Sequence, residues 1–175
     1  MSIHLADDYA EATDGHRLHR VFEQPATSLR GTYLVQDRSG RAGRGYLHKT
    51  KDKRAKLYSY KCSYPHTDRV INGVKKQDRE EYTWNIEDLC ARLAEFNEEY
   101  IGVGLGNRSI NKSDEPSELT MFNCNRGFLL DIANMPVKGD LTIRFLDWRS
   151  PIVFEHKPFY ALLMPSRPPQ EVRNA

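Results

Sequence analysis

Cysteine is scarce in this chain, and the three cysteines that it has are far apart. Cys62, Cys90 and Cys124 are odd in number and form no Cys-x-x-Cys pair. This spacing argues against the disulfide framework of a small secreted domain and against the common structural zinc motifs. We therefore expect a reduced, intracellular protein that is stabilised by a hydrophobic core.

Long hydrophobic runs are also missing. The longest continuous apolar stretch is residues 159–164, far below the ~18 residues that a membrane-spanning helix needs. Residues 1–8 have neither the basic start nor the apolar run of a signal peptide. These two absences predict a cytoplasmic protein without a membrane partner.

A large excess of charge of one sign is missing as well. The 175 residues contain 26 Lys and Arg against 24 Asp and Glu, a formal net charge of +2. The overall charge therefore does not require a polyanionic partner. The length and the 39% hydrophobic share are those of an ordinary globular domain. We expect one domain over residues 1–164 and a proline-rich, disordered tail over residues 165–175.

Apolar residues that alternate with polar ones predict several strands. The alternation is clearest in residues 57–64, whose tyrosines and cysteine fall on one face, because successive side chains of a strand point to opposite sides. The pair Asn72-Gly73 predicts a tight hairpin turn whose return arm is residues 82–84. The expected strands are residues 32–36, 46–48, 57–64, 82–84, 119–123, 141–146, 152–154 and 159–164.

Helical spacing is strongest in residues 86–100, with Asn85 as a suitable N-cap and Gly102 as a suitable end. Shorter helices are expected at 3–12 and 128–134, and a long polar loop at 104–118. No internal repeat is visible. The pattern predicts an α+β domain, in which a mainly antiparallel sheet packs against one amphipathic helix and one or two short ones. The apolar stripe of the main helix consists of Ile86, Leu89, Cys90, Leu93, Phe96 and Tyr100.

Charge is distributed unevenly along the chain. Residues 38–61 contain nine Lys and Arg against a single Asp, and acidic residues gather at 7–14 and 87–99. Clustered cations can follow a phosphate backbone and release its condensed counterions. Aromatic side chains on a sheet face can stack unpaired bases. The region 38–61 therefore has the composition of a nucleic-acid contact.

The first functional hypothesis is a non-enzymatic protein that docks a basic hairpin, residues 38–61, on RNA or DNA without a cofactor. A structural interpretation stays open beside it, because exposed cations also prevent strand edges from pairing with other chains. The tyrosine row is also typical of a strand that faces a core. In the first hypothesis, the cations contact phosphates and the two tyrosines stack on bases: Arg41, Arg44, Lys49, Lys51, Lys53, Arg54, Tyr58 and Tyr60.

A second hypothesis is a protein-binding adaptor or inhibitor that recognises an acidic protein surface by charge complementarity. A compact chain without catalytic or targeting motifs suits a factor that is encoded by a phage or mobile element and acts on a host protein or nucleoprotein complex. Both hypotheses describe a binding protein.

A third hypothesis is a magnesium-dependent nuclease of the PD-(D/E)xK type. Asp140 opens one expected strand, and Glu155-x-Lys157 ends the next. In such an enzyme the two carboxylates hold the metal and the lysine orients the attacking water. Gly139 stands where the motif has proline, and Pro158 follows the lysine directly, so the match is incomplete.

Other catalytic patterns are weaker. His16 and His19 are spaced to share a helix face, but Arg17 and Arg20 beside them disfavour a bound cation. His48 and His66 flank the strand expected at 57–64 and could serve as the acid–base pair of a metal-independent ribonuclease, but only their proximity to positive charge supports this. The glycines of 102–106 follow a helix instead of a strand, which argues against a dinucleotide loop.

Overall fold

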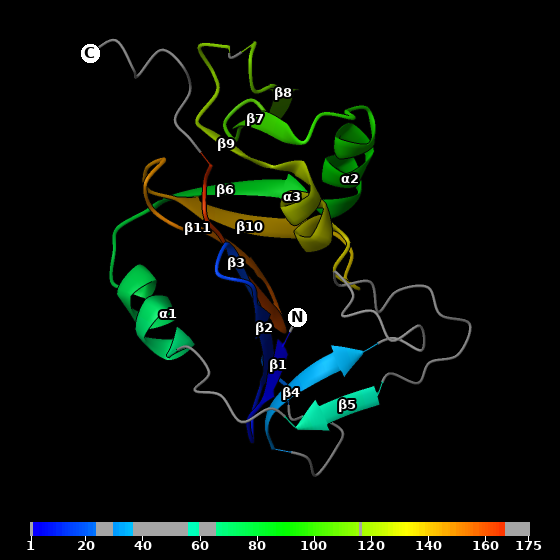
Figure 1. The fold of residues 1–175 in the computed structure, drawn as a ribbon. Helices are drawn as coiled ribbons and strands as arrows, with labels where there is room; N and C mark the ends of the chain where they lie inside the picture. Colours follow the sequence, from blue (N-terminus) through cyan, green and yellow to red (C-terminus); the bar gives the residue numbers. More distant parts are fainter. Residues whose placement is uncertain (1, 24–29, 37–55, 60–65, 116, 167–175) are drawn as a thin grey trace.

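The computed structural model describes residues 2–23, 30–36, 56–59, 66–115 and 117–166 (Figure 1). Within these residues the structure has two sheets, whose strands pair antiparallel, and three helices, which confirms the predicted α+β class. The larger sheet has the order β5-β4-β1-β2-β3-β12-β11-β10-β6, and the smaller sheet has the order β8-β7-β9. The strands are β1 (Ser2–Leu5), β2 (Ala10–Thr13), β3 (Arg17–Val21), β4 (Gly31–Gln36), β5 (Lys56–Ser59), β6 (Glu80–Asn85), β7 (Tyr100–Gly104), β8 (Ser109–Lys112), β9 (Phe122–Asn125), β10 (Asp140–Phe145), β11 (Ile152–His156) and β12 (Phe159–Leu163).

The helices cover the two faces of the large sheet unequally. Figure 1 shows α2 (Ile86–Ala94) and α3 (Arg126–Ala133) side by side, whereas α1 (Thr67–Lys75) lies apart from them. Alternation along β12 separates the faces: Ala161 and Leu163 belong to the main core, and Tyr160 and Leu162 belong to a second cluster with residues of α1. The strands β11 and β12 are thus packed on both sides.

Two units of the fold repeat each other. The first is β6-α2-β7-β8 and the second is β9-α3-β10-β11. In each unit the strand after the helix pairs with the next strand of its own unit and with the first strand of the other unit, as β7 does with β8 and β9 and β10 does with β11 and β6. The two units are therefore interleaved across the two sheets.

The helix starts show how exact the repeat is. Asn85 accepts a hydrogen bond from the backbone N of Asp88 at 3.2 Å, and Asn125 accepts one from that of Phe128 at 3.3 Å. Both are N-caps, a role in which an Asn side chain satisfies a free N–H of the first turn. The backbone bonds Ile86 N to Gly139 O, at 2.9 Å, and Arg126 N to Glu99 O, at 2.8 Å, also correspond.

This repeat is one of structure, and the sequence, in which no repeat is visible, shows little of it. Asn85 and Asn125 match, as do Leu89 and Leu129, but most other equivalent positions differ in sequence. What the units share is the period of their buried residues and the cap. A comparison of residue identities misses such a repeat because different apolar side chains fill equivalent core positions equally well.

Two local predictions are wrong because tertiary packing overrides local preference. Residues 3–12, expected as a helix, form the hairpin of β1 and β2, which is flanked by β4 and β3. The turn expected at Asn72-Gly73 lies inside α1, where Thr67, Ile71 and Val74 are buried on one helical face. The strand expected at 82–84 is confirmed within β6, but it is not the return arm of a hairpin.

The main helix is shorter than expected. Its N-cap is Asn85 as predicted, but α2 ends at Ala94 and the chain becomes β7 from Tyr100. Gly102 lies within that strand, where an added Cβ would be 2.9 Å from the Cγ2 of Thr120. The expected loop 104–118 contains β8, which buries Ile110. The strands expected at 32–36, 141–146, 152–154 and 159–164, and the helix at 128–134, are confirmed to within a few residues.

Candidate binding surfaces

The basic region 38–61 falls mostly outside the described residues. Arg41, Arg44, Lys49, Lys51, Lys53, Arg54 and Tyr60 lie there, and for Tyr58 the structure describes the backbone alone, on β5 opposite Leu34. The strand before the region, β4, pairs with β5, which lies within the region, at one end of the large sheet. Both sides of β4 are paired, with β1 and with β5, and the strand expected at 46–48 lies outside the described residues.

The residues of the nuclease hypothesis lie on neighbouring strands but form no described metal site. Asp140 is exposed at the start of β10, and Glu155 lies on β11 opposite Thr142. An oxygen of Glu155 is 3.3 Å from Nη2 of Arg144, whose guanidinium also lies 3.4 Å from Glu81. Lys157 is exposed beyond the end of β11. Within the described ranges, no group of three or more His, Cys, Asp or Glu is placed to hold a metal ion.

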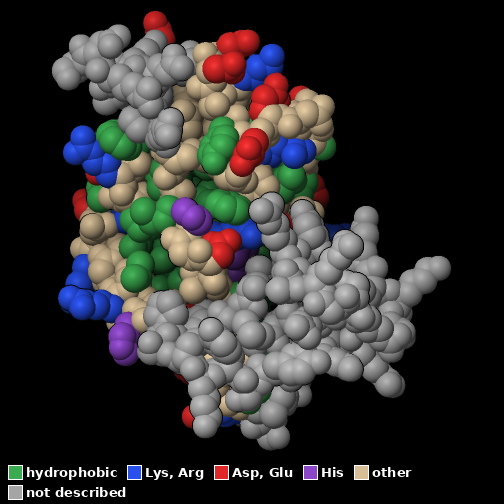
Figure 2. Space-filling view, viewed as in Figure 1, with side chains coloured by type: hydrophobic (Ala, Val, Ile, Leu, Met, Phe, Trp, Pro, Cys, Tyr) green, Lys and Arg blue, Asp and Glu red, His purple; other side chains and the backbone are tan. Residues whose placement is uncertain are grey.

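The surface around α1 combines buried and exposed apolar side chains. Leu18, Ile71, Val74, Val153, Tyr160 and Leu162 form its buried cluster. Phe22 is 44% exposed and lies edge-on to the ring of Tyr160 at 6.3 Å, while Val70 on α1 and Met164 after β12 are 50% and 40% exposed. Hydrophobic side chains gather on this side of the molecule, next to a histidine and an acidic side chain (Figure 2). We call this surface the α1 face.

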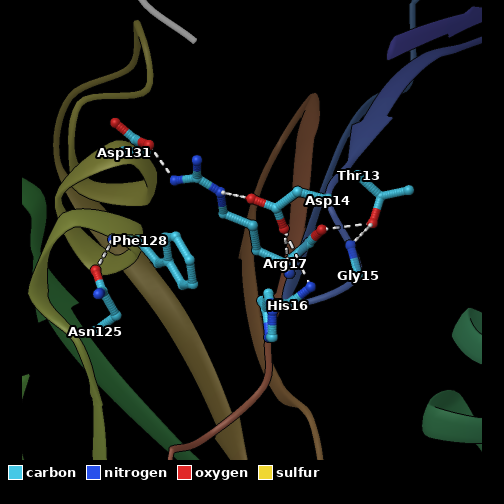
Figure 3. Close-up of polar contacts among 8 residues, drawn as sticks. All are labelled: Thr13, Asp14, Gly15, His16, Arg17, Asn125, Phe128 and Asp131. Atoms are coloured by element: carbon cyan, nitrogen blue, oxygen red, sulfur yellow. Dashed lines mark hydrogen bonds and ion pairs between the residues drawn. The ribbon is translucent and has the colours of Figure 1, made fainter. Parts of the chain in front are cut away.

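The turn before β3 connects the α1 face to α3. The Oδ1 of Asp14 accepts hydrogen bonds from the backbone N of His16 and of Arg17, both at 3.1 Å, which fixes the turn. Arg17 lies between two carboxylates, those of Asp14 and Asp131, and its guanidinium stacks over the ring of Phe128 at 4.5 Å (Figure 3). The residue after β12 joins the same turn through a bond from Met164 N to His16 O, at 2.8 Å.

His16 and His19 do not share a helix face, contrary to the spacing argument. His16 is exposed in the turn, and its ring stacks on Phe128 at a centroid distance of 5.9 Å. His19 lies on β3, and its Nε2 has no hydrogen-bond partner among the described residues. Burial and the neighbouring Arg17 lower the pKa of His19 to about 4, so its ring is neutral at physiological pH. Neither histidine is arranged for metal binding.

A buried charged network fastens α1 to the sheet. Arg20, 4% exposed, donates to Glu11 at 2.7 and 2.9 Å and to Asp68 of α1 at 2.6 Å. Thr67, also buried, donates to the other oxygen of Glu11 at 2.7 Å. Burial opposes the charge of Arg20, but its hydrogen bonds to Asp68 and Glu11 outweigh this and raise its pKa. The start of α1 is thereby held over β2 and β3.

Sequence reasoning missed the α1 face and the network beneath it. The spacing of Thr67, Ile71 and Val74 is that of a helix. The preference of an Asn-Gly pair for a tight turn favoured a hairpin at this place instead. Arg20 and Glu11 lie in segments without a distinctive motif, and only the register between β2 and β3, which places them opposite each other, brings them together.

The layered sheets and interleaved units define a known class of fold, that of the sliding clamps of bacterial DNA polymerase III. The beta subunit from Streptococcus pyogenes has a TM-score of 0.60 at 16% identity, over 95% of this chain and 57% of that one. The beta subunit from Thermotoga maritima has a TM-score of 0.56 at 16% identity, over 95% and 56%. The Helicobacter pylori beta clamp, solved bound to a DNA ligase peptide, has a TM-score of 0.58 at 11% identity, over 95% and 56%.

These comparisons show the fold. This chain spans a little over half the length of the clamp chains that it matches, 56–57% for the three above. No family model matches the sequence, and no curated protein does. None of the helices in the described part of the chain is long and apolar enough to cross a membrane.

Proposed function

We propose that this chain is a non-enzymatic, clamp-like binding protein that contacts DNA through its basic region, residues 38–61. The observation that carries the proposal is the fold match, since nearly the whole chain resembles beta subunits of a DNA polymerase. The charge pattern supports it, because nine Lys and Arg stand against one Asp in this region, and such clusters bind phosphate backbones by releasing counterions.

The two ends of the large sheet differ in charge. The described part of the basic region is β5, at one end of the large sheet, and the acidic residues of α2 follow β6 at the other end. The acidic residues of the second region are Glu87 and Asp88 in the first turn of α2, and Glu95, Glu98 and Glu99 after it. A polyanion is attracted to the first end and repelled from the second.

The test is fluorescence anisotropy of labelled single- and double-stranded DNA and RNA, titrated in EDTA at two salt concentrations. We expect DNA binding that weakens steeply with salt, and a loss of about tenfold or more when Lys51→Glu and Lys53→Glu are combined, because two phosphate contacts are replaced by repulsion. A matched control combines Lys76→Glu with Lys138→Glu, which changes the net charge equally at exposed positions outside the basic region.

Equal losses in the two double variants would contradict the proposed site, because affinity would then follow net charge alone. Absence of DNA binding at low salt would contradict the function itself. Tighter binding to RNA than to DNA would change the assigned nucleic acid and keep the site. A repeat in magnesium reports on nuclease activity, which this proposal does not include.

A second candidate function is docking of a partner protein, as in the adaptor hypothesis, and one observation favours the α1 face for it. Phe22, Val70 and Met164 are exposed around a buried apolar cluster, and exposed apolar patches are typical of protein contacts. One structural neighbour is a clamp bound to a DNA ligase peptide. We infer that an apolar peptide segment binds across this face.

A labelled copy of that DNA ligase peptide is the probe. Met164→Asp is expected to weaken its binding about tenfold, because it places a charge in an apolar contact. Leu119→Asp, at a position 58% exposed outside the α1 face, is the matched control and is expected to have no effect. No binding, or the same loss in both variants, would contradict docking on the α1 face.

A further inference from the structure

A small cavity lies under the end of α1, and neither proposed function uses it. Its volume is about 120 Å³. Its walls come from the C-terminal part of α1, the turn that follows, and the strands β6, β10, β11 and β12. Its polar lining residues are Lys75, Gln77, Asp78, Arg79, Glu81, Arg144, Glu155 and Tyr160.

Two residues of the cavity wall carry buried polar atoms that have no hydrogen-bond partner among the described residues. One is Oη of Tyr160, whose side chain is only 3% exposed, and the other is Nε of Arg79. A buried polar group without a partner is costly and therefore rare in folded proteins. Two such atoms around one cavity indicate that the cavity accommodates something that they bind.

Three basic and three acidic side chains line the cavity, the acidic ones being Asp78, Glu81 and Glu155. The two terminal nitrogens of Arg79 already donate to Pro151 O and to Gln77 Oε1, both at 2.5 Å, which leaves its Nε–H. The carboxylates of Glu81 and Glu155 both lie against Arg144. Lys75 adds an ammonium group 5.6 Å from the centre of the Tyr160 ring.

We propose that this cavity is a binding site for a small oxyanion, a carboxylate or phosphate group, which accepts hydrogen bonds from Arg79 Nε and Tyr160 Oη and is attracted by Lys75. Charge-assisted hydrogen bonds of this kind are the strong ones. Bound metal is disfavoured, since no group of three potential ligand residues is placed for one in the described ranges. The site is independent of the DNA contact proposed above.

The size of the cavity and the state of its hydroxyl agree with this ligand. A volume of about 120 Å³ is below the ~300 Å³ at which pockets for drug-sized ligands begin. A single carboxylate or phosphate group is a ligand of suitable size. Burial, with the charge of Glu155, raises the pKa of Tyr160 to about 12, which keeps its hydroxyl protonated and able to donate.

The experiment is an NMR titration of the whole chain with sodium phosphate and with sodium acetate, at ionic strength held constant by sodium chloride. The Nε–H signal of Arg79 is the readout. We expect a saturable shift, and Tyr160→Phe is expected to weaken binding at least fivefold because it removes one donor and leaves the ring in place. Tyr100→Phe, at a residue 44% exposed on β7, is the matched control.

A third probe distinguishes the source of the oxyanion. A capped Gly-Glu-Gly peptide that binds more tightly than acetate would assign the site to an acidic side chain of a partner, whereas phosphate or acetate that binds at least as tightly would assign it to a free anion. Shifts that grow linearly without saturation, or that are equal in the Tyr160→Phe and Tyr100→Phe variants, would overturn the proposal. A thermal melt of each variant verifies that it is folded.

Discussion

The two faces of the large sheet are built in different ways around the same strands. On the side of α2 and α3 lies a broad apolar core that includes Trp84 and Phe154 of the large sheet and Phe122 of the small sheet, each at most 1% exposed. Against α1 the large sheet buries six side chains, together with an ion network and a cavity. Ala161 and Tyr160, which are neighbours on one strand, thus lie in different buried clusters.

The difference separates stability from binding. Burial of apolar surface supplies most of the free energy of folding, and the α2 and α3 side has most of that surface. The α1 face keeps exposed apolar side chains, unpartnered donors and buried charges, each of which costs stability. Features that lower stability are retained most readily where they recognise a ligand or partner, which is why both candidate sites among the described residues lie on this side.

The largest effect is expected from the core against α2 and α3. Phe122→Ala removes a ring that is fully buried and stacked on Phe145 at 5.8 Å. We expect the free energy of unfolding to fall by about 4 kcal/mol, from lost burial and the cavity left behind. Chemical denaturation measures it, and Leu119→Ala at an exposed site serves as the control. A loss below about 1 kcal/mol would mean that this side is not the main source of stability.

A smaller and more local effect is expected from the ion network under α1. Arg20→Met leaves the carboxylate of Glu11, 2% exposed, without its main partner, and we expect a loss of about 3 kcal/mol. The combination with Glu11→Leu is expected to recover most of it, because the uncompensated charge is gone. Hydrogen exchange checks that opening is concentrated in α1. An additive loss in the double variant would contradict this reading of the network.

The smallest effect depends on pH and distinguishes His19 from the exposed His16. The pKa of His19 is lowered to about 4 in the folded protein, against roughly 6.5 when unfolded. The unfolded chain therefore takes up the proton first, and stability that is complete above pH ~6.5 falls as the pH drops towards 4. Denaturation at several pH values is expected to show this slope reduced in His19→Gln and unchanged in His16→Gln. Equal slopes in both variants would contradict it.

Much of the fold follows from the sequence where local pattern and tertiary packing agree. The late strands and α3 alternate or repeat with the right period, and Asn85 marks the start of α2 as its chemistry predicts. The pattern fails where residues far apart decide the outcome. Residues 3–12 become strands because β3 and β4 flank them, and Asn72-Gly73 stays helical because Ile71 and Val74 pack on the sheet.

The candidate sites differ in the same way, since one is visible in the sequence and the other is not. The basic region is visible as composition and falls mostly outside the described residues, so its DNA contact stays a proposal. The oxyanion cavity depends on Arg79 and Tyr160, which are far apart in the chain and meet only when the end of α1 reaches β12. No sequence pattern indicates that these two residues are neighbours, because their proximity depends on the complete strand order of the sheet.

The interleaved units have a consequence for how this part of the molecule assembles. The first residue of α2 donates its backbone N–H to Gly139 O of the other unit, and the first residue of α3 donates its N–H to Glu99 O. The strand after each helix also pairs with the first strand of the other unit, β7 with β9 and β10 with β6. The pair therefore resembles a symmetric dimer whose two subunits have been joined in one chain. The segment between β8 and β9 links the two units covalently, so their association is intramolecular and does not depend on protein concentration.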